Sequence, residues 1–253
     1  MTTIEVRDDE EIARGAERAI DILAGALDAL ALEGSARVAS GRVFTTVGAW
    51  WIGMTRSAQA IVLLRQSGLA HEAAPIARTI LQHGLVLQWL ADTGEQGVDA
   101  VAQYGYDNLR KLLRTLEEAN WPMPPEAVIE EPPAPAPELA PLVRSFANFA
   151  QLCINYDAQQ LYVPFRLLSA LVHPTLESAM AYVADAGGLV SRAVAPTHSH
   201  VIQAGMCLIQ AGQTVSSLIA GDPLRTALVA AEAALGMEVA PWQPTCRNQP
   251  GTS

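Results

Sequence analysis

Apolar residues along most of the chain recur at steps of three and four, the period of an amphipathic helix. The stretch from residue 8 to residue 33 shows this period through Ile12, Ala16, Ile20, Leu23, Leu27 and Leu30. Further helices are predicted over residues 43–66, 71–91, 98–120, 142–155, 159–173, 174–187, 197–220 and 223–235. Val, Ile, Thr and aromatic residues, which strands favour, are too thinly spread for a sheet. The pattern therefore predicts an all-α protein.

Single residues mark the ends of several of these helices. Asp8 or Asp9 can cap the first helix, and Gly34 is expected to end it. Asp222 followed by Pro223 is a suitable cap and first position for the last helix.

One segment interrupts the helical pattern, because residues 121–141 hold eight of the sixteen prolines. We expect an exposed, extended loop there. A chain of 253 residues is near the upper end of what one hydrophobic core serves. The pattern thus predicts a single helical bundle of about seven to nine helices over residues 1–236, followed by a loose tail over residues 237–253.

The net charge of −10 at pH 7 is unevenly placed, since residues 1–33 carry nine acids and three Arg. An acidic chain is a poor general binder of nucleic acid, which needs a basic surface. Net charge does not determine the charge of a small, locally basic pocket. Fifteen of the sixteen basic residues are Arg, a side chain suited to planar anions.

The three cysteines are an odd number without metal-type spacing, which favours a reducing compartment. The acidic first residues do not resemble a signal peptide. Residues 193–221 contain no Asp, Glu, Lys or Arg, but Gln and Ser recur there about every turn, and Gly205 and Gly212 allow close packing. That combination predicts a buried central helix instead of a membrane span. We therefore expect a cytoplasmic protein with no membrane partner.

Polar side chains stand inside two of the most apolar predicted helices. Arg166, Ser169 and His173 lie on one stripe, because steps of three and then four residues make about two turns. In the third predicted helix, Arg78 and Gln82 lie one turn apart within an apolar run. Buried polar side chains need partners or a cavity. We therefore expect these two helices to share a polar pocket.

The residues of this predicted pocket resemble a known family. One stretch is the run from Ala73 to Arg78 before an apolar helix, and the other is Tyr162 followed by an Arg-Leu-Leu-Ser run and His173-Pro174. Both stretches resemble a family of bacterial helical proteins known only as a domain of unknown function. The resemblance spans about residues 45–185. That family places an acid one turn after the first Arg, where this chain has Gln82, so the charge needed to pair with an Arg or to act as an acid or base is missing at that position.

The same stretch resembles, more loosely, the ribonuclease motif of the HEPN superfamily, an Arg and a His separated by four to six residues on a bundle that usually dimerises. Arg166 and His173 match the longest of these spacings. The resemblance implies a metal-independent endoribonuclease, a toxin or defence effector, with His173 transferring a proton and Arg166 stabilising the phosphorane charge. The chain departs from the motif at Leu167, where a polar residue is common.

A structural alternative gives the stripe no chemistry. Arg166 would pair with Asp107 or Asp157, Ser169 would bond the carbonyl four residues earlier, and His173 would end the helix. Removing the Arg166 charge from such a buried network would cost about 3–5 kcal/mol.

We expect a non-catalytic binding or interaction protein that forms a homodimer and uses no cofactor. The residues predicted to bind a ligand are Arg78, Gln82, Tyr162 and Ser169. The expected partner is a small ligand or a protein, with RNA as a partner only under the ribonuclease alternative.

Other candidate sites are weaker. His173 and Glu177 have the spacing of a helical metal pair, but Pro174 stands between them, so no metal site is expected. His198 and His200 are expected to be exposed helix caps.

Overall fold

The computed structural model of the protein describes residues 8–33, 41–122, 133–134, 136–184, 187–191 and 198–245. Within these residues it is all-α, as predicted, with ten α-helices and two short 3₁₀-helices and no strand. The helices are α1 (Asp9–Glu33), α2 (Gly41–Gln66), α3 (Ala74–Thr93), α4 (Glu95–Glu118), α5 (Ala140–Ala147), α6 (Phe149–Asn155), α7 (Gln159–Val172), α8 (Leu176–Met180), α9 (Ser199–Ser217) and α10 (Arg225–Leu235), with 3₁₀ turns η1 (His71–Ala73) and η2 (Pro137–Leu139).

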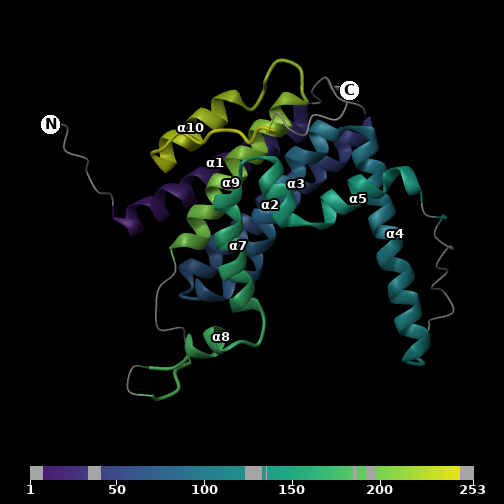
Figure 1. The fold of residues 1–253 in the computed structure, drawn as a ribbon. Helices are drawn as coiled ribbons and strands as arrows, with labels where there is room; N and C mark the ends of the chain where they lie inside the picture. Colours follow the sequence, from purple (N-terminus) through teal and green to yellow (C-terminus); the bar gives the residue numbers. More distant parts are fainter. Residues whose placement is uncertain are drawn as a thin grey trace.

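Helix α9 is the centre of the bundle, because it packs against α1, α2, α3 and α10 (Figure 1). Its glycines make this possible: a Cβ added at Gly205 would lie 3.2 Å from the Cβ of Ala16. A Cβ added at Gly212 would lie 2.9 Å from a methyl carbon of Leu228. The buried central helix predicted from the sequence is confirmed. No described helix combines the length and apolarity needed to cross a bilayer.

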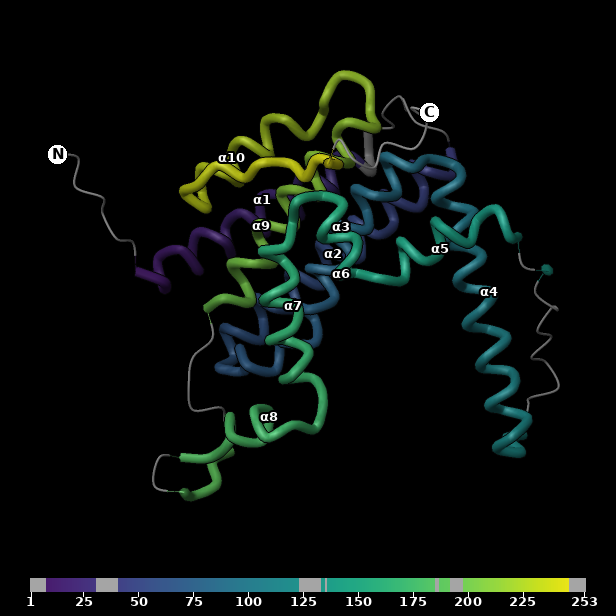
Figure 2. The backbone as a smooth tube through the Cα atoms, in the orientation of Figure 1, coloured from purple at the N-terminus to yellow at the C-terminus, as the bar shows by residue number. Residues whose placement is uncertain are grey.

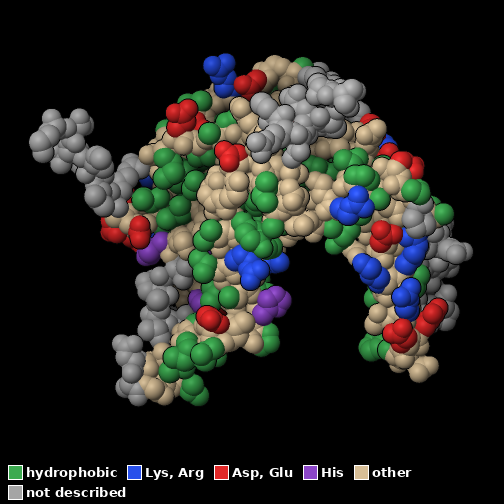
Figure 3. All heavy atoms as spheres, viewed as in Figure 1, with side chains coloured by type: hydrophobic (Ala, Val, Ile, Leu, Met, Phe, Trp, Pro, Cys, Tyr) green, Lys and Arg blue, Asp and Glu red, His purple; other side chains and the backbone are tan. Residues whose placement is uncertain are grey.

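Helix α3 connects this core to a second group of helices, since it also packs against α4, α6 and α7, while α5 packs on α4. The second half of α4 extends away from the other helices, and α8 lies beyond the end of α7 (Figures 1 and 2). The space-filling view shows a hollow between these two extensions, with Lys and Arg side chains on both of its sides (Figure 3).

Several predicted helix ends are wrong. The helix expected over residues 142–155 is broken at Asn148, which leaves the helical region (φ −110°, ψ 89°) and caps α6 by accepting the Gln151 N–H. The helix expected up to residue 187 ends at Met180, and a turn closed by a Val183–Leu189 bridge follows.

The last helix begins at Arg225 and not at Pro223. Asp222 has a positive φ of 48° and accepts a hydrogen bond from the Ser216 hydroxyl, so it ends the connection after α9 and does not cap α10 through its side chain.

Part of the tail expected to be loose is packed on the core. Val239 and Trp242 are buried, and a Cβ added at Gly84 of α3 would lie 2.8 Å from the Trp242 ring. The expected end at Gly34, most of the Pro-rich segment and Cys246 lie outside the described residues.

Candidate functional site

One hydrogen bond joins the two helices that were expected to share a polar pocket. The Arg78 Nε–H of α3 donates to the Ser169 Oγ of α7 over 2.8 Å. The Ser169 hydroxyl in turn donates to the Phe165 carbonyl oxygen, four residues earlier, over 2.7 Å. Ser169 therefore accepts the Arg78 hydrogen bond while its own hydrogen is used within α7.

The Arg78 guanidinium also lies over an aromatic ring. Its Cζ is 4.4 Å from the centroid of the Phe165 ring, a cation–π distance. Phe165 contacts Phe149 at 4.5 Å and is stacked with Tyr162 at 6.1 Å between centroids. These contacts hold the guanidinium in one orientation. Its two Nη groups make no hydrogen bond to a described residue, so they remain available to a ligand.

An open cleft of about 600 Å³ lies beside this guanidinium, between α3, α5, α6 and α7. Arg78 and Gln82 from α3, Arg144 from α5, Asn148, and the aromatic residues Phe149, Tyr162 and Phe165 line it. Its volume falls within the range of roughly 300–1,000 Å³ that is typical of small-molecule sites.

The lining of the cleft is basic, since it holds Arg78 and Arg144 and no acid. Neither Arg makes an ion pair with an acid in the described part of the chain, whereas Arg42, Arg65 and Arg110 all do. Arg144 is exposed, and Arg78 is half-buried. Positive charge without a neutralising carboxylate makes this cleft suited to an anion.

The structure brings together all four residues that were predicted to bind a ligand. Arg78, Gln82 and Tyr162 line the cleft, and Ser169 holds Arg78 from behind. Their role in binding stays a prediction.

The expected buried network around Arg166 is wrong. Arg166 and His173 are both exposed, and Asp107 pairs with Arg110 instead. The physical reason is the packing of α7, which buries only Leu168 and leaves Leu167 65% exposed. His173 does end the helix, in an extended conformation (φ −90°, ψ 157°) that the following Pro174 favours.

Sequence reasoning missed the contribution of α5 and α6 to the cleft. Arg144, Asn148 and Phe149 line it only because the chain turns at Asn148. Asn, a strong N-cap residue, was the signal for this turn in the sequence, but the apolar period on either side hid it.

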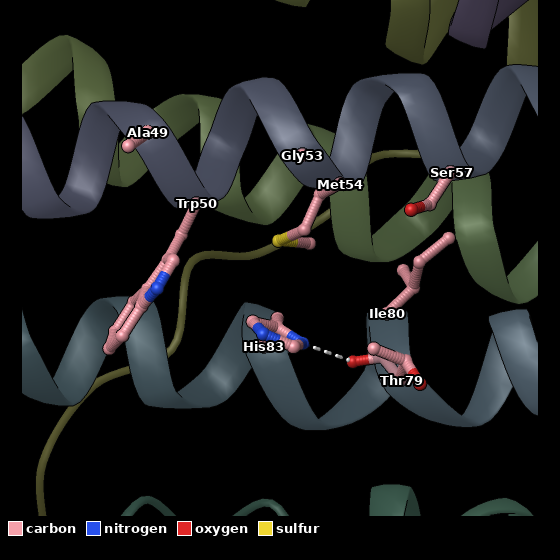
Figure 4. A pocket seen from close by; sticks show the side chains of 8 residues that line it. All are labelled: Ala49, Trp50, Gly53, Met54, Ser57, Thr79, Ile80 and His83. Atoms are coloured by element: carbon pink, nitrogen blue, oxygen red, sulfur yellow. Dashed lines mark hydrogen bonds between the residues drawn. The ribbon is translucent and has the colours of Figure 1, made fainter. Parts of the chain in front are cut away.

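A second, smaller pocket of about 170 Å³ lies between α2 and α3 (Figure 4). Trp50, Met54 and Ser57 extend from α2 toward α3, where His83 and Ile80 face them. The pocket shares no residue with the cleft, although Trp50 is stacked with Phe146 of α5 at 6.5 Å.

A chain of hydrogen bonds connects Tyr156, just after α6, to Thr214 of α9. Tyr156 donates its hydroxyl hydrogen to Asp92 over 2.7 Å, Gln88 donates to Asp92 over 2.9 Å, and Thr214 donates to Gln88 over 2.5 Å. Burial raises the pKa of Asp92, with these hydrogen bonds opposing it. Burial and the neighbouring Asp92 raise the pKa of Tyr156. These groups stabilise the packing of α3 and do not face the cleft.

The remaining candidates do not form sites. His200, expected to be exposed, is buried with its Nδ1 2.9 Å from the Ala70 carbonyl oxygen, and burial lowers its pKa. Burial raises the pKa of the Cys153 and Cys207 thiols to about 11 and about 12, which makes both unreactive. Among the described residues, no group of His, Cys, Asp and Glu is arranged to hold a metal ion.

Comparison with known proteins identifies a family for the chain. No curated protein and no solved structure matches the chain. One family model matches residues 45–188, more than half of the chain, and this range includes α3, α5, α6 and α7. The chain therefore belongs to the family of unknown function DUF5677.

Proposed function

We propose that this protein is a non-catalytic binding protein that holds an organic anion in the cleft between α3, α5, α6 and α7. The observation that carries the proposal is the state of Arg78. Its Nε is bonded to Ser169 and its plane lies on Phe165, while its Nη groups are unused by described residues. A guanidinium held in this way pays little conformational entropy when it binds a carboxylate or phosphate through two parallel hydrogen bonds.

The rest of the lining suggests the other part of the ligand. Tyr162, Phe149 and Phe165 offer flat apolar surface, and the Gln82 amide makes no hydrogen bond to a described residue. Arg144 supplies a second positive charge at the exposed side of the cleft. A ligand with one anionic group attached to a flat ring satisfies all of these groups.

Isothermal titration calorimetry with phenyl phosphate, benzoate and the neutral benzamide tests this proposal. We expect the anions to bind and benzamide not to. Arg78→Met should weaken binding by about 10- to 100-fold, because a hydrogen bond to a charged group contributes about 1.5–3 kcal/mol. Arg56, exposed on α2 and away from the cleft, supplies the matched control Arg56→Met. No binding of either anion at millimolar concentration, or equal weakening by both variants, would refute the proposal.

The homodimer expected from the sequence is part of the same proposal. Val163 and Leu167 on α7 are 61% and 65% exposed, and Leu176 on α8 is 74% exposed. Val163 and Leu167 lie one turn apart on α7, and clustered exposed apolar residues mark interaction surfaces. Sedimentation should show a dimer that Leu167→Glu dissociates, and a wild-type monomer would remove this part of the proposal.

A second candidate function, a HEPN-like endoribonuclease, is favoured by one observation. Arg166 and His173 are exposed, and neither side chain bonds a described residue, so both can reach a phosphate group. Their Cα atoms are about 10 Å apart along α7, two turns of helix. The candidate requires that wild type cleaves RNA and that His173→Ala abolishes cleavage without lowering Tm. A wild-type protein without cleavage excludes it.

A further inference from the structure

The pocket between α2 and α3 is a second place where a ligand fits, and the proposed function does not use it. Met54 and Ile80 form an apolar floor, since they are only 3% and 1% exposed. A Cβ added at Gly53 would meet nothing within 4 Å, so the α2 side of the pocket is unobstructed. The pocket has a volume of about 170 Å³, similar to the roughly 150 Å³ of an enclosed apolar cavity that holds benzene, but the exposed Gly53 and Thr79 in its lining leave it partly open to solvent.

The walls of the pocket favour an aromatic ring. Trp50 and His83 meet edge to face at 6.0 Å between centroids, and the Trp50 ring stands at one end of the pocket (Figure 4). The sulfur of Met54 lies between the two helices (Figure 4). Aromatic rings pack favourably against other rings and against thioether sulfur.

His83 determines which polar group the ligand must carry. Its Nδ1 is 2.9 Å from the Thr79 carbonyl oxygen. A carbonyl oxygen only accepts, so Nδ1 carries the hydrogen, and Nε2 of the neutral ring is left as an acceptor. Nε2 has no partner among the described residues. The ligand therefore has to offer an O–H or N–H donor.

We infer that the pocket formed by Trp50, Met54, Ser57, Ile80 and His83 binds a small aromatic molecule that carries one hydroxyl or N–H donor, of the phenol or indole class. The ring fills the space between Met54, Ile80 and Trp50. Its donor bonds Nε2 of His83. The Ser57 hydroxyl, which bonds no described residue, lies at the opposite end of the pocket, where a second small polar substituent is tolerated (Figure 4).

Binding of phenol, indole and toluene to the full-length protein tests this inference. Calorimetry and saturation-transfer NMR give the affinities. We expect phenol and indole to bind about tenfold more tightly than toluene, which fills the same space but leaves Nε2 unpaired. If neither phenol nor indole binds at millimolar concentration, or if toluene binds as well as phenol, the inference is wrong.

Two variants locate the binding. Gly53→Leu adds a large side chain at the lining of the pocket, where an added Cβ meets nothing within 4 Å, and it should abolish phenol binding. Gly105→Leu is its matched control, because Gly105 is also a mid-helix glycine whose added Cβ meets nothing within 4 Å, and it should bind phenol as wild type does. His83→Leu, which keeps the pocket but removes the acceptor, should reduce the affinity for phenol to that for toluene. Wild-type affinity for phenol in either Gly53→Leu or His83→Leu would place the ligand elsewhere and overturn the inference.

Discussion

The hydrogen bond between Arg78 and Ser169 is predicted to couple α3 and α7 energetically, and a double-mutant cycle measures that coupling. The variants are Arg78→Met, which keeps the apolar stem of the side chain, Ser169→Ala, and both together. The 2.8 Å bond has a charged donor, for which about 1.5–3 kcal/mol is typical in a buried setting. Both side chains are half-buried, so solvent screening reduces the expected coupling energy to about 1 kcal/mol.

The single variants have further contributions of their own. Arg78→Met also loses the contact with the Phe165 ring, worth about 0.5–1 kcal/mol, so its total cost is about 1.5–2 kcal/mol. Ser169→Ala loses the bond within α7, but alanine regains about 0.5 kcal/mol of helix propensity. The total expected for Ser169→Ala is about 1 kcal/mol.

Urea unfolding followed by circular dichroism gives the four free energies of unfolding, compared at a common m value. Arg166→Met is the control on α7, the helix that carries Ser169. Because the Arg166 side chain is exposed, we expect the free energy of unfolding to change by no more than about 0.5 kcal/mol. A coupling energy below about 0.3 kcal/mol, or a cost for Arg166→Met as large as that for Arg78→Met, would refute the assignment of Arg78 as the residue that α7 orients.

Three further predictions concern the bundle that carries the cleft. Gly15→Ala should destabilise the protein by at least about 2 kcal/mol, because its Cβ would lie 2.5 Å from a carbonyl oxygen of α10. Gly25→Ala in the same helix, where an added Cβ meets nothing within 4 Å, should stabilise the protein by about 0.5–1 kcal/mol. Thermal unfolding of both variants checks the sign of each change. Burial raises the pKa of Asp92 above its ordinary value of 3.8, so the folded state binds this proton more tightly than the unfolded state does. The wild type should therefore lose stability as the pH rises from 3.8 through the raised pKa, and Asp92→Asn should remove that loss. Urea midpoints of variant and wild type measured against pH test this, and parallel curves would contradict the argument. Arg65→Met should cost about 2 kcal/mol, because it leaves Glu17, whose side chain is 16% exposed, without its cation; a change within about 0.5 kcal/mol would show that this ion pair contributes nothing.

The helices and part of the cleft could be predicted from local patterns. Apolar residues that recur at steps of three and four positions form one apolar face of a helix, and that face has to be buried. The pattern made α1, α2, α3, α7 and α9 recognisable without the structure. A polar residue inside such a run has to be satisfied, which is why Arg78 and Ser169 could be expected to meet. The helices could be predicted because each helical period depends on residues within a few turns of one another, whereas Arg78 and Ser169 are 91 positions apart and only their polarity within apolar runs indicated that they need partners.

The failures depend on contacts between segments far apart in the chain. Whether Arg166 is buried was decided by what covers the outer face of α7, and in the described part of the protein nothing does. Whether Arg144 reaches the cleft was decided by the turn at Asn148, which carries α5 back toward α4. The sequence by itself determined which surfaces are apolar enough to require burial, through their helical period. Only the tertiary structure decided which helix packs against each apolar surface. The partner of a surface lies far away in the sequence, and the local pattern of residues does not specify whether that partner is α3 or α4.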